Sequence, residues 1–167
     1  MDRMTITNVL RWIHILAGAA WLGEVVVVKF VLVPLLSHLE PNKRGWFLAA
    51  VFPRVFRLAS IFSLTTILAG AALNLSLNGW QLDVALLRLT SSRWGWRILA
   101  GGLLGLALTL FHFVAERRLE PHVLAAHEES DGEAFARILR HLQIIPRVGL
   151  GVLLLAFLLM MFASRGL

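Results

Sequence analysis

The 167-residue chain contains no cysteine, and only 16% of its residues are charged. Without cysteine there can be no disulfide bond, cysteine-based zinc site, iron–sulfur cluster or thiol catalysis. Soluble domains are roughly half apolar and about a quarter charged. Here hydrophobic residues make up 58% of the chain and the mean hydropathy is +0.76, so the composition excludes an ordinary soluble domain and indicates a membrane protein.

The chain also lacks the short motifs of common enzymes. It has no G-x-S-x-G, P-loop or H-E-x-x-H sequence, so no catalytic residue is predicted and a non-enzymatic role is favoured. The net charge of +6 comes from basic residues beside apolar runs rather than on a polar face. That placement predicts a lipid bilayer as the partner, and no nucleic acid.

Four apolar stretches can each cross about 30 Å of hydrocarbon, which takes roughly 20 helical residues. In lipid the backbone must satisfy its own hydrogen bonds, so these stretches are predicted to be helices. We expect residues 1–167 to form one all-α transmembrane domain with spans at about 9–36, 58–77, 96–113 and 144–162. A signal peptide is the alternative for the first stretch, but Arg11 and His14 interrupt its apolar core.

Three connections separate the spans, at about 37–57, 78–95 and 114–143, and the second contains an amphipathic piece. In the third, Asp131-Gly132-Glu133 is typical of a helix start. The apolar residues of 133–143 then recur at steps of three and four, which places them on one face. This pattern predicts a short interfacial helix that leads into the fourth span.

A weak internal repeat relates the two halves of the chain. Leu39-Glu40-Pro41 after the first span recurs as Leu119-Glu120-Pro121 after the third, and Pro53-Arg54-Val55 recurs as Pro146-Arg147-Val148. The shared order predicts an integral membrane four-helix bundle built from two helical hairpins in parallel orientation.

Lysine and arginine set the expected orientation. The face with the first and third connections carries nine, and the face with both termini and the second connection carries six. The nine are Lys43, Arg44, Arg54, Arg57, Arg117, Arg118, Arg137, Arg140 and Arg147; the six are Arg3, Arg11, Arg88, Arg93, Arg97 and Arg165. The excess predicts a bacterial-type inner membrane location with both termini outside.

Polar groups inside the first span are candidate functional residues, because such groups tend to face the bundle or a cavity. Glu24 is predicted to face the bundle interior, either as a hydrogen-bonded structural acid or as part of a proton or cation path. Lys29 is five residues further on, about 140° around an ideal helix, so the two do not share a face. Lys29 is expected to extend its amine toward the nearer interface.

Methionine and histidine are unevenly distributed between the two ends of the spans. The four methionines lie at the end that also holds His14, and five histidines lie at or near the other end: Met1, Met4, Met160, Met161, and His38, His112, His122, His127, His141. Thioether and imidazole groups are ligands for copper. We therefore weigh a copper site of His14, Met160 and Met161 against ordinary helix packing.

A second candidate metal site lies at the end of the third span. His112 and Glu116 are four residues apart, so they share a helix face. With Glu120, His122, and His38 or His141, they would make a divalent-metal site; the alternative is a hydrogen-bonded interfacial histidine with solvated carboxylates. Haem b is a further candidate cofactor, since helical bundles hold it between facing helices. Its ligands would be His14 with Met160 or Met161, or His112 with His38.

Several of these motifs together resemble the copper resistance protein D-like family of membrane proteins. They are His14-Ile15-Leu16-Ala17, Trp21-Leu22-Gly23, Val31-Leu32-Val33-Pro34, Phe52-Pro53-Arg54-Val55-Phe56-Arg57-Leu58, Gly70, Ser92-Arg93-Trp94-Gly95, His112 with Pro121, Pro146-Arg147-Val148 and Arg165-Gly166. The likeness covers almost the whole chain. It implies a four-helix domain associated with copper uptake or tolerance. The related HemJ-type protoporphyrinogen oxidase has a third-helix lysine, where this chain has Arg97 and no lysine.

Three hypotheses follow for the function. The first is a membrane protein that handles copper through uptake, tolerance or delivery, and the second is a haem b protein with electron-transfer or oxidase chemistry. The third is an accessory subunit of a larger membrane complex or homo-oligomer, which would contribute helix packing and no chemistry.

Overall fold

The computed structural model describes residues 2–125 and 132–164, and within them every regular element is helical. The elements are α1 (Arg3–Val27), the π-helical segment η1 (Val28–Leu32), α2 (Val33–His38), α3 (Pro41–Leu77), α4 (Leu82–Ser91), α5 (Arg93–Ala125) and α6 (Gly132–Ser164). The all-α prediction is confirmed for this part of the chain.

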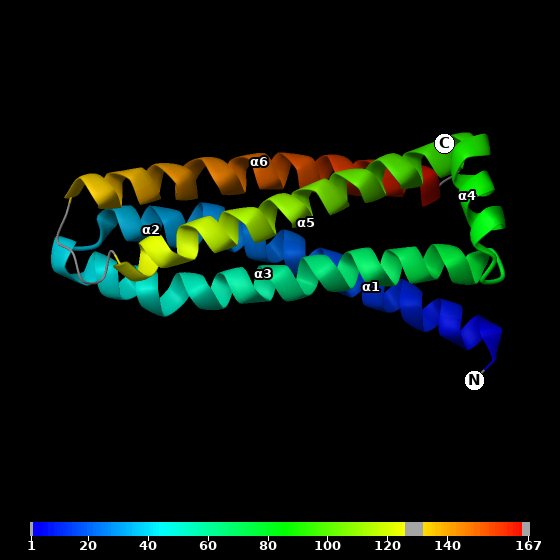
Figure 1. The fold of residues 1–167 in the computed structure, drawn as a ribbon, viewed down its shortest axis with the longest axis horizontal. Coiled ribbons are helices and arrows are strands. Elements are labelled where there is room, and N and C mark those ends of the chain that lie inside the picture. Colours follow the sequence, from blue (N-terminus) through cyan, green and yellow to red (C-terminus); the bar gives the residue numbers. More distant parts are fainter. Residues whose placement is uncertain (1, 126–131, 165–167) are drawn as a thin grey trace.

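Four long helical segments lie side by side, and α4 crosses one end of them (Figure 1). The segment α1–η1–α2 packs on α3, α5 packs on α6, and α3 joins the two pairs by packing on α5. Both chain ends lie at the end that α4 crosses, and the start of α1 diverges from the other helices. In the described residues four helices are long and apolar enough to cross a membrane: Arg3–His38, Pro41–Leu77, Arg93–Arg118 and Phe135–Ser164.

The predicted first connection at 37–57 is helical for most of its length. Helix α3 begins at Pro41, so only Leu39 and Glu40 separate it from α2. Proline suits the first turn of a helix, because the amide it lacks would have no partner there. The chain then continues as helix through Pro53 to Leu77. The amphipathic piece of the second connection is helical, as α4.

The residues of the predicted interfacial helix at 133–143 are helical, as predicted, but they are not a separate short helix. They continue without a break into the fourth predicted span as one helix, α6. Ile138 and Leu142 lie in a core cluster with Leu36, Leu48 and Phe52. The apolar face is therefore buried against α2 and α3. Asp131, at the predicted helix start, lies outside the described residues.

The π-helical segment η1 has a local cause in Pro34. Proline has no amide hydrogen, and in a regular α-helix its ring collides with the carbonyl four residues earlier, here that of Phe30. A π-turn inserts one extra residue, and the Val33 amide closes it by donating to the Val28 carbonyl. The first helical passage thus continues past Pro34 without ending.

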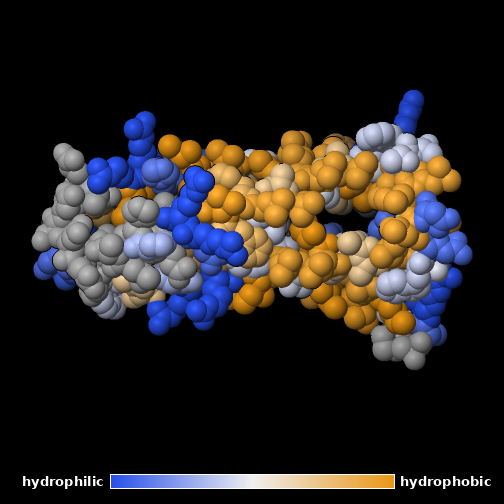
Figure 2. Space-filling model, viewed as in Figure 1, coloured by the Kyte–Doolittle hydropathy of each residue, from blue (hydrophilic) through white to orange (hydrophobic). Residues whose placement is uncertain are grey.

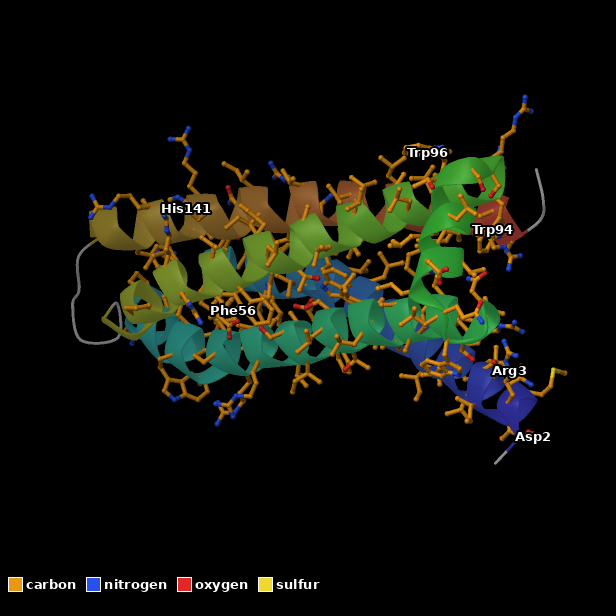
Figure 3. The ribbon with its side chains drawn as sticks, turned by 45° about the vertical axis from the view of Figure 1, so that its right-hand side comes forward. Asp2, Arg3, Phe56, Trp94, Trp96 and His141 are labelled. Carbon is orange, nitrogen blue, oxygen red and sulfur yellow. The ribbon has the colours of Figure 1, made fainter. Side chains whose placement is uncertain are left out.

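The exterior of the molecule is apolar along the middle of the bundle and polar at its ends (Figure 2). Large apolar side chains such as Leu16, Leu68, Leu103 and Leu110 are more exposed than buried. Such a belt is compatible with contact to a lipid bilayer. Trp94 and Trp96 lie toward the end that holds Arg3 (Figure 3); Trp96 is exposed, and exposed tryptophans are typical of the membrane–water boundary.

Candidate functional site

A cavity of about 70 Å³ lies between α1, α3, α5 and α6. Its lining is mostly apolar and includes Trp21 and Pro146. Three ionisable side chains also line it: Glu24 from α1, and His112 and Glu116 from α5. Ionisable groups that share an apolar cavity, between helices long and apolar enough to cross a membrane, mark this as the candidate functional site.

His112 and Glu116 form the half of the site whose side chains have protein partners. The Nε2 atom of His112 lies 3.8 Å from Oε2 of Glu116, and both side chains are less than one-fifth exposed. The Ser60 hydroxyl of α3 donates a 2.6 Å hydrogen bond to the same carboxylate oxygen. The Nε2–H of His112 donates to the Phe56 carbonyl at 3.2 Å, so in the neutral tautomer of the ring Nδ1 carries the lone pair.

Glu24 is the unpaired half of the site. Its side chain lines the cavity one helical turn after the buried Trp21. Its carboxyl group has no hydrogen bond or ion pair with any residue that the structure describes. The side chain therefore lines the interior cavity, but no group of the described residues bonds to its carboxyl oxygens. Water inside the cavity is the remaining source of hydrogen bonds.

Hydroxyl groups continue from this cavity along the inner face of α3. Ser60, Ser63 and Thr66 follow one another at steps of three, and Ser63 is completely buried. Ser63 donates to the Ser60 carbonyl at 3.2 Å, and Thr66 donates to the Phe62 carbonyl at 2.7 Å. We call Ser60, Ser63 and Thr66 the α3 hydroxyl row. The row runs along α3 from Ser60, which bonds Glu116, to Thr66, whose carbonyl bonds His14.

His14 lies at the far end of this row. Its Nδ1–H donates to the Thr66 carbonyl at 2.9 Å, and the ring packs directly on Gly70. The Nε2 atom has no hydrogen bond within the described part of the chain, so it carries a free lone pair. An imidazole with Nδ1–H held by a carbonyl and Nε2 left open has the usual arrangement of a metal-ligating histidine.

The predicted methionine partners of His14, Met160 and Met161, lie near the end of α6. Met160 packs on Gly101 of α5, where an added Cβ would lie 3.0 Å from its methyl group. Met161 is 42% exposed on the outside of α6. His14 contacts α3, so the structure does not show the three residues together as one ligand set. Met1 lies outside the described residues.

The larger metal site predicted around His112 is not assembled from neighbouring histidines. His38 and His141 are exposed, and each donates from Nδ1 to a carbonyl of its own helix, at 2.8 Å in both cases. His127 lies outside the described residues, and the side chains of Glu120 and His122 are also outside them. Across residues 2–125 and 132–164, no three histidine or carboxylate side chains are grouped closely enough to hold a metal ion.

Lys29 lies in the π-helical segment η1. Its Nζ atom is 4.7 Å from the centre of the Phe30 ring, a cation–π contact. No ion pair joins it to Glu24 among the described residues. The amine thus has an aromatic contact of its own, and Glu24 has no cationic partner within residues 2–125 and 132–164.

Sequence reasoning missed two contributors to the site. Ser60 anchors Glu116 from a position 56 residues away, and the sequence pattern contains no signal for that pairing. Pro146 lines the cavity and has no amide hydrogen, so it cannot bond the Leu142 carbonyl one turn earlier. The motif Pro146-Arg147-Val148, which the internal repeat singles out, is the sequence signal for this position.

The helices and cavity define a class of protein, a multi-pass helical chain with ionisable groups between its apolar helices. Comparisons of the chain with protein-family models, curated proteins and solved structures found no match. The resemblance to the copper resistance protein D-like family stays a prediction based on the motifs quoted above.

Proposed function

We propose that this protein is an integral membrane four-helix bundle that transfers protons across the bilayer through its interior. Glu24 is the central proton carrier in this proposal, and His112 with Glu116 connects it to one membrane face. The observation that carries the proposal is the Glu24 carboxyl group, which faces the cavity it shares with His112 and Glu116 and has no bonded partner in the described residues.

The depth of each group supports a relay. Glu116 lies two residues before the end of the span Arg93–Arg118, beside exposed Arg117, so it is near an interface. Glu24 lies 14 residues before the end of its span at His38, about 21 Å along a helix. A proton that enters at Glu116 passes through cavity water to the free Nδ1 of His112, and the ring then releases a proton through water to Glu24.

In this relay, water molecules bridge the gaps between the ionisable side chains. A cavity of about 70 Å³ has room for roughly two water molecules at their liquid volume of about 30 Å³ each. Beyond Glu24, the α3 hydroxyl row and the free Nε2 of His14 continue the polar path toward the other face. Each transfer moves one proton between an acid and its neighbour, so the path resets without any redox partner.

Proton flux into vesicles tests this proposal. We expect purified protein in liposomes to acidify the lumen when a potassium gradient and valinomycin supply the driving potential. A pH-sensitive dye inside the liposomes reports the change. Glu24→Gln keeps the size of the side chain but cannot ionise, and should lower the rate at least tenfold. Glu40→Gln is the matched control, because Glu40 is exposed and pairs with Lys43 at the surface. Equal rates for Glu24→Gln and wild type would contradict the proposal.

Copper handling at His14 is the second candidate function, and the arrangement of its ring favours it. Nδ1–H is held by the Thr66 carbonyl while Nε2 is open, and Nε2 of imidazole is a ligand for copper and for haem iron. The remaining ligands are not grouped in the described chain, so no metal-dependent step is derived.

Metal analysis and an absorption spectrum of the purified protein separate the cofactor alternatives. Stoichiometric copper that falls in His14→Ala supports copper handling, and a Soret band that falls in the same variant supports haem b. Protein that carries neither cofactor would contradict this second candidate. His38→Ala is the control, since His38 is exposed and bonded to its own helix.

A further inference from the structure

A second, more open cavity lies at the end of the bundle that holds the N-terminus. Its volume is about 410 Å³, and it lies between the first turns of α1 and the last turn of α3. Arg3, Thr7 and Arg11 line it at steps of four residues, so they share one face of α1, and Asn8 and Ser76 add further polar groups. We call it the basic cleft.

One arginine of the basic cleft is fixed in place. The guanidinium of Arg3 donates from Nη2 to the Ser76 carbonyl at 3.4 Å and packs against Gly79. Gly79 has a positive φ of 74°, which glycine adopts without strain, and an added Cβ would lie 2.9 Å from Nη2. Thr7 and Ser76 share a 2.6 Å hydroxyl hydrogen bond that joins the two walls below it.

The cleft has two cationic side chains and no internal counter-ion. Neither Arg3 nor Arg11 has a carboxylate within ion-pair distance in the described residues. The nearest acid in the sequence, Asp2, caps α1 by accepting from the Thr5 amide at 2.9 Å. Hydrogen bonds with the Thr5 side chain and backbone lower the pKa of Asp2 below its ordinary value, so this carboxylate is already engaged.

The level of the cleft matches the boundary between lipid tails and headgroups. Trp12, the residue after Arg11, is 63% exposed, and Trp96 is 58% exposed at the same end of the bundle. Tryptophan is enriched at that boundary. The segment Arg3–His38 is also about 54 Å long at 1.5 Å per residue, well beyond the hydrocarbon thickness of about 30 Å. The first turns of α1 thus lie among headgroups.

We propose that the basic cleft binds the phosphate group of an anionic membrane lipid. Guanidinium groups bind phosphate with paired, charge-assisted hydrogen bonds, and Asn8 and the hydroxyl pair provide further contacts to a headgroup. The apolar side chains Met4 and Leu77, which also line the cleft, contact the glycerol and the first part of the acyl chains. This lipid fixes the diverging start of α1 against α3.

Lipid retention in native mass spectrometry tests the proposal. We expect wild-type protein in detergent to bind phosphatidylglycerol at least tenfold more tightly than phosphatidylcholine. Arg3→Gln with Arg11→Gln should weaken phosphatidylglycerol binding roughly tenfold for each guanidinium removed. Arg93→Gln is the control, because Arg93 is an exposed arginine at the same end of the bundle but outside the cleft.

A second variant keeps the test decisive if the double variant unfolds. Asn8→Asp retains both arginines but places a carboxylate in the cleft, and should also weaken phosphatidylglycerol binding. Inorganic phosphate distinguishes the source of the phosphate group, since a lipid site should not be emptied by it at equal concentration. Displacement by inorganic phosphate, equal binding of the two lipids, or unchanged binding in Asn8→Asp would each overturn the proposal. None of these results depends on proton transfer.

Discussion

His14 and Gly70 are in direct contact across the α1–α3 interface. A Cβ atom added to Gly70 would lie 2.9 Å from both Cε1 and Nδ1 of the His14 ring, closer than side chains normally approach. Glycine at this position therefore lets the Cε1–Nδ1 edge of the ring approach α3 closely and lets Nδ1–H reach the Thr66 carbonyl. The contact determines the position of the free Nε2 atom.

Gly70→Ala should displace this ring. Overpacking in a filled interface costs about 1–3 kcal/mol of stability. This exceeds the roughly 0.5–1 kcal/mol of stability that a helix gains when alanine replaces glycine. We expect a lower free energy of unfolding in detergent, measured by thermal or denaturant melts. Gly102→Ala is the control, since no atom lies within 4 Å of its added Cβ, and it should be neutral or stabilising. Equal stability of the two variants would show that the ring is not confined.

Ser60 and Glu116 should be energetically coupled. The Ser60 hydroxyl donates a 2.6 Å hydrogen bond to a carboxylate that is mostly shielded from solvent. Hydrogen bonds to charged groups contribute about 1.5–3 kcal/mol, so Ser60→Ala should destabilise the protein by about that amount. The double variant Ser60→Ala with Glu116→Gln should lose much less free energy of unfolding than the sum of the losses in the two single variants. Strict additivity in such a double-mutant cycle would mean that the bond contributes nothing.

The predicted orientation, with both termini outside, is based on the excess of lysine and arginine near the first and third connections. Because the chain has no cysteine, single cysteines can be introduced without removing native ones. Asn42→Cys, at the start of α3, should resist an impermeant thiol reagent in intact cells, and Ser164→Cys, at the end of α6, should react. Both side chains are exposed in the structure. The reverse labelling would place the termini in the cytoplasm.

Hydropathy predicted the four long apolar helices, but it did not predict where each helix begins and ends. Lys43, Arg44 and Arg54 made residues 41–57 resemble a loop, yet Leu48 and Phe52 between them are completely buried. Average hydropathy cannot detect this, because only one face of the helix is apolar.

Candidate residues within one helix were easier to relate than residues on different helices. The 112–116 pairing follows from helical periodicity, and the structure brings His112 and Glu116 within 3.8 Å of each other. The partner of His14 could not be predicted, because it is a backbone carbonyl, which every residue has. The Ser60–Glu116 pairing depends on how far α3 is shifted along α5, and no feature of a single sequence determines that shift.

Infrared spectroscopy of the Glu24 carboxyl group tests the central claim most directly. A group that exchanges protons through a water-containing cavity should give a protonated-carboxyl carbonyl band that shifts promptly when the protein is moved into D₂O. The band should be missing in Glu24→Gln and unchanged in Glu40→Gln. A Glu24 band that fails to shift in D₂O, or a spectrum that Glu24→Gln leaves unaltered, would contradict the account of Glu24 as a proton carrier.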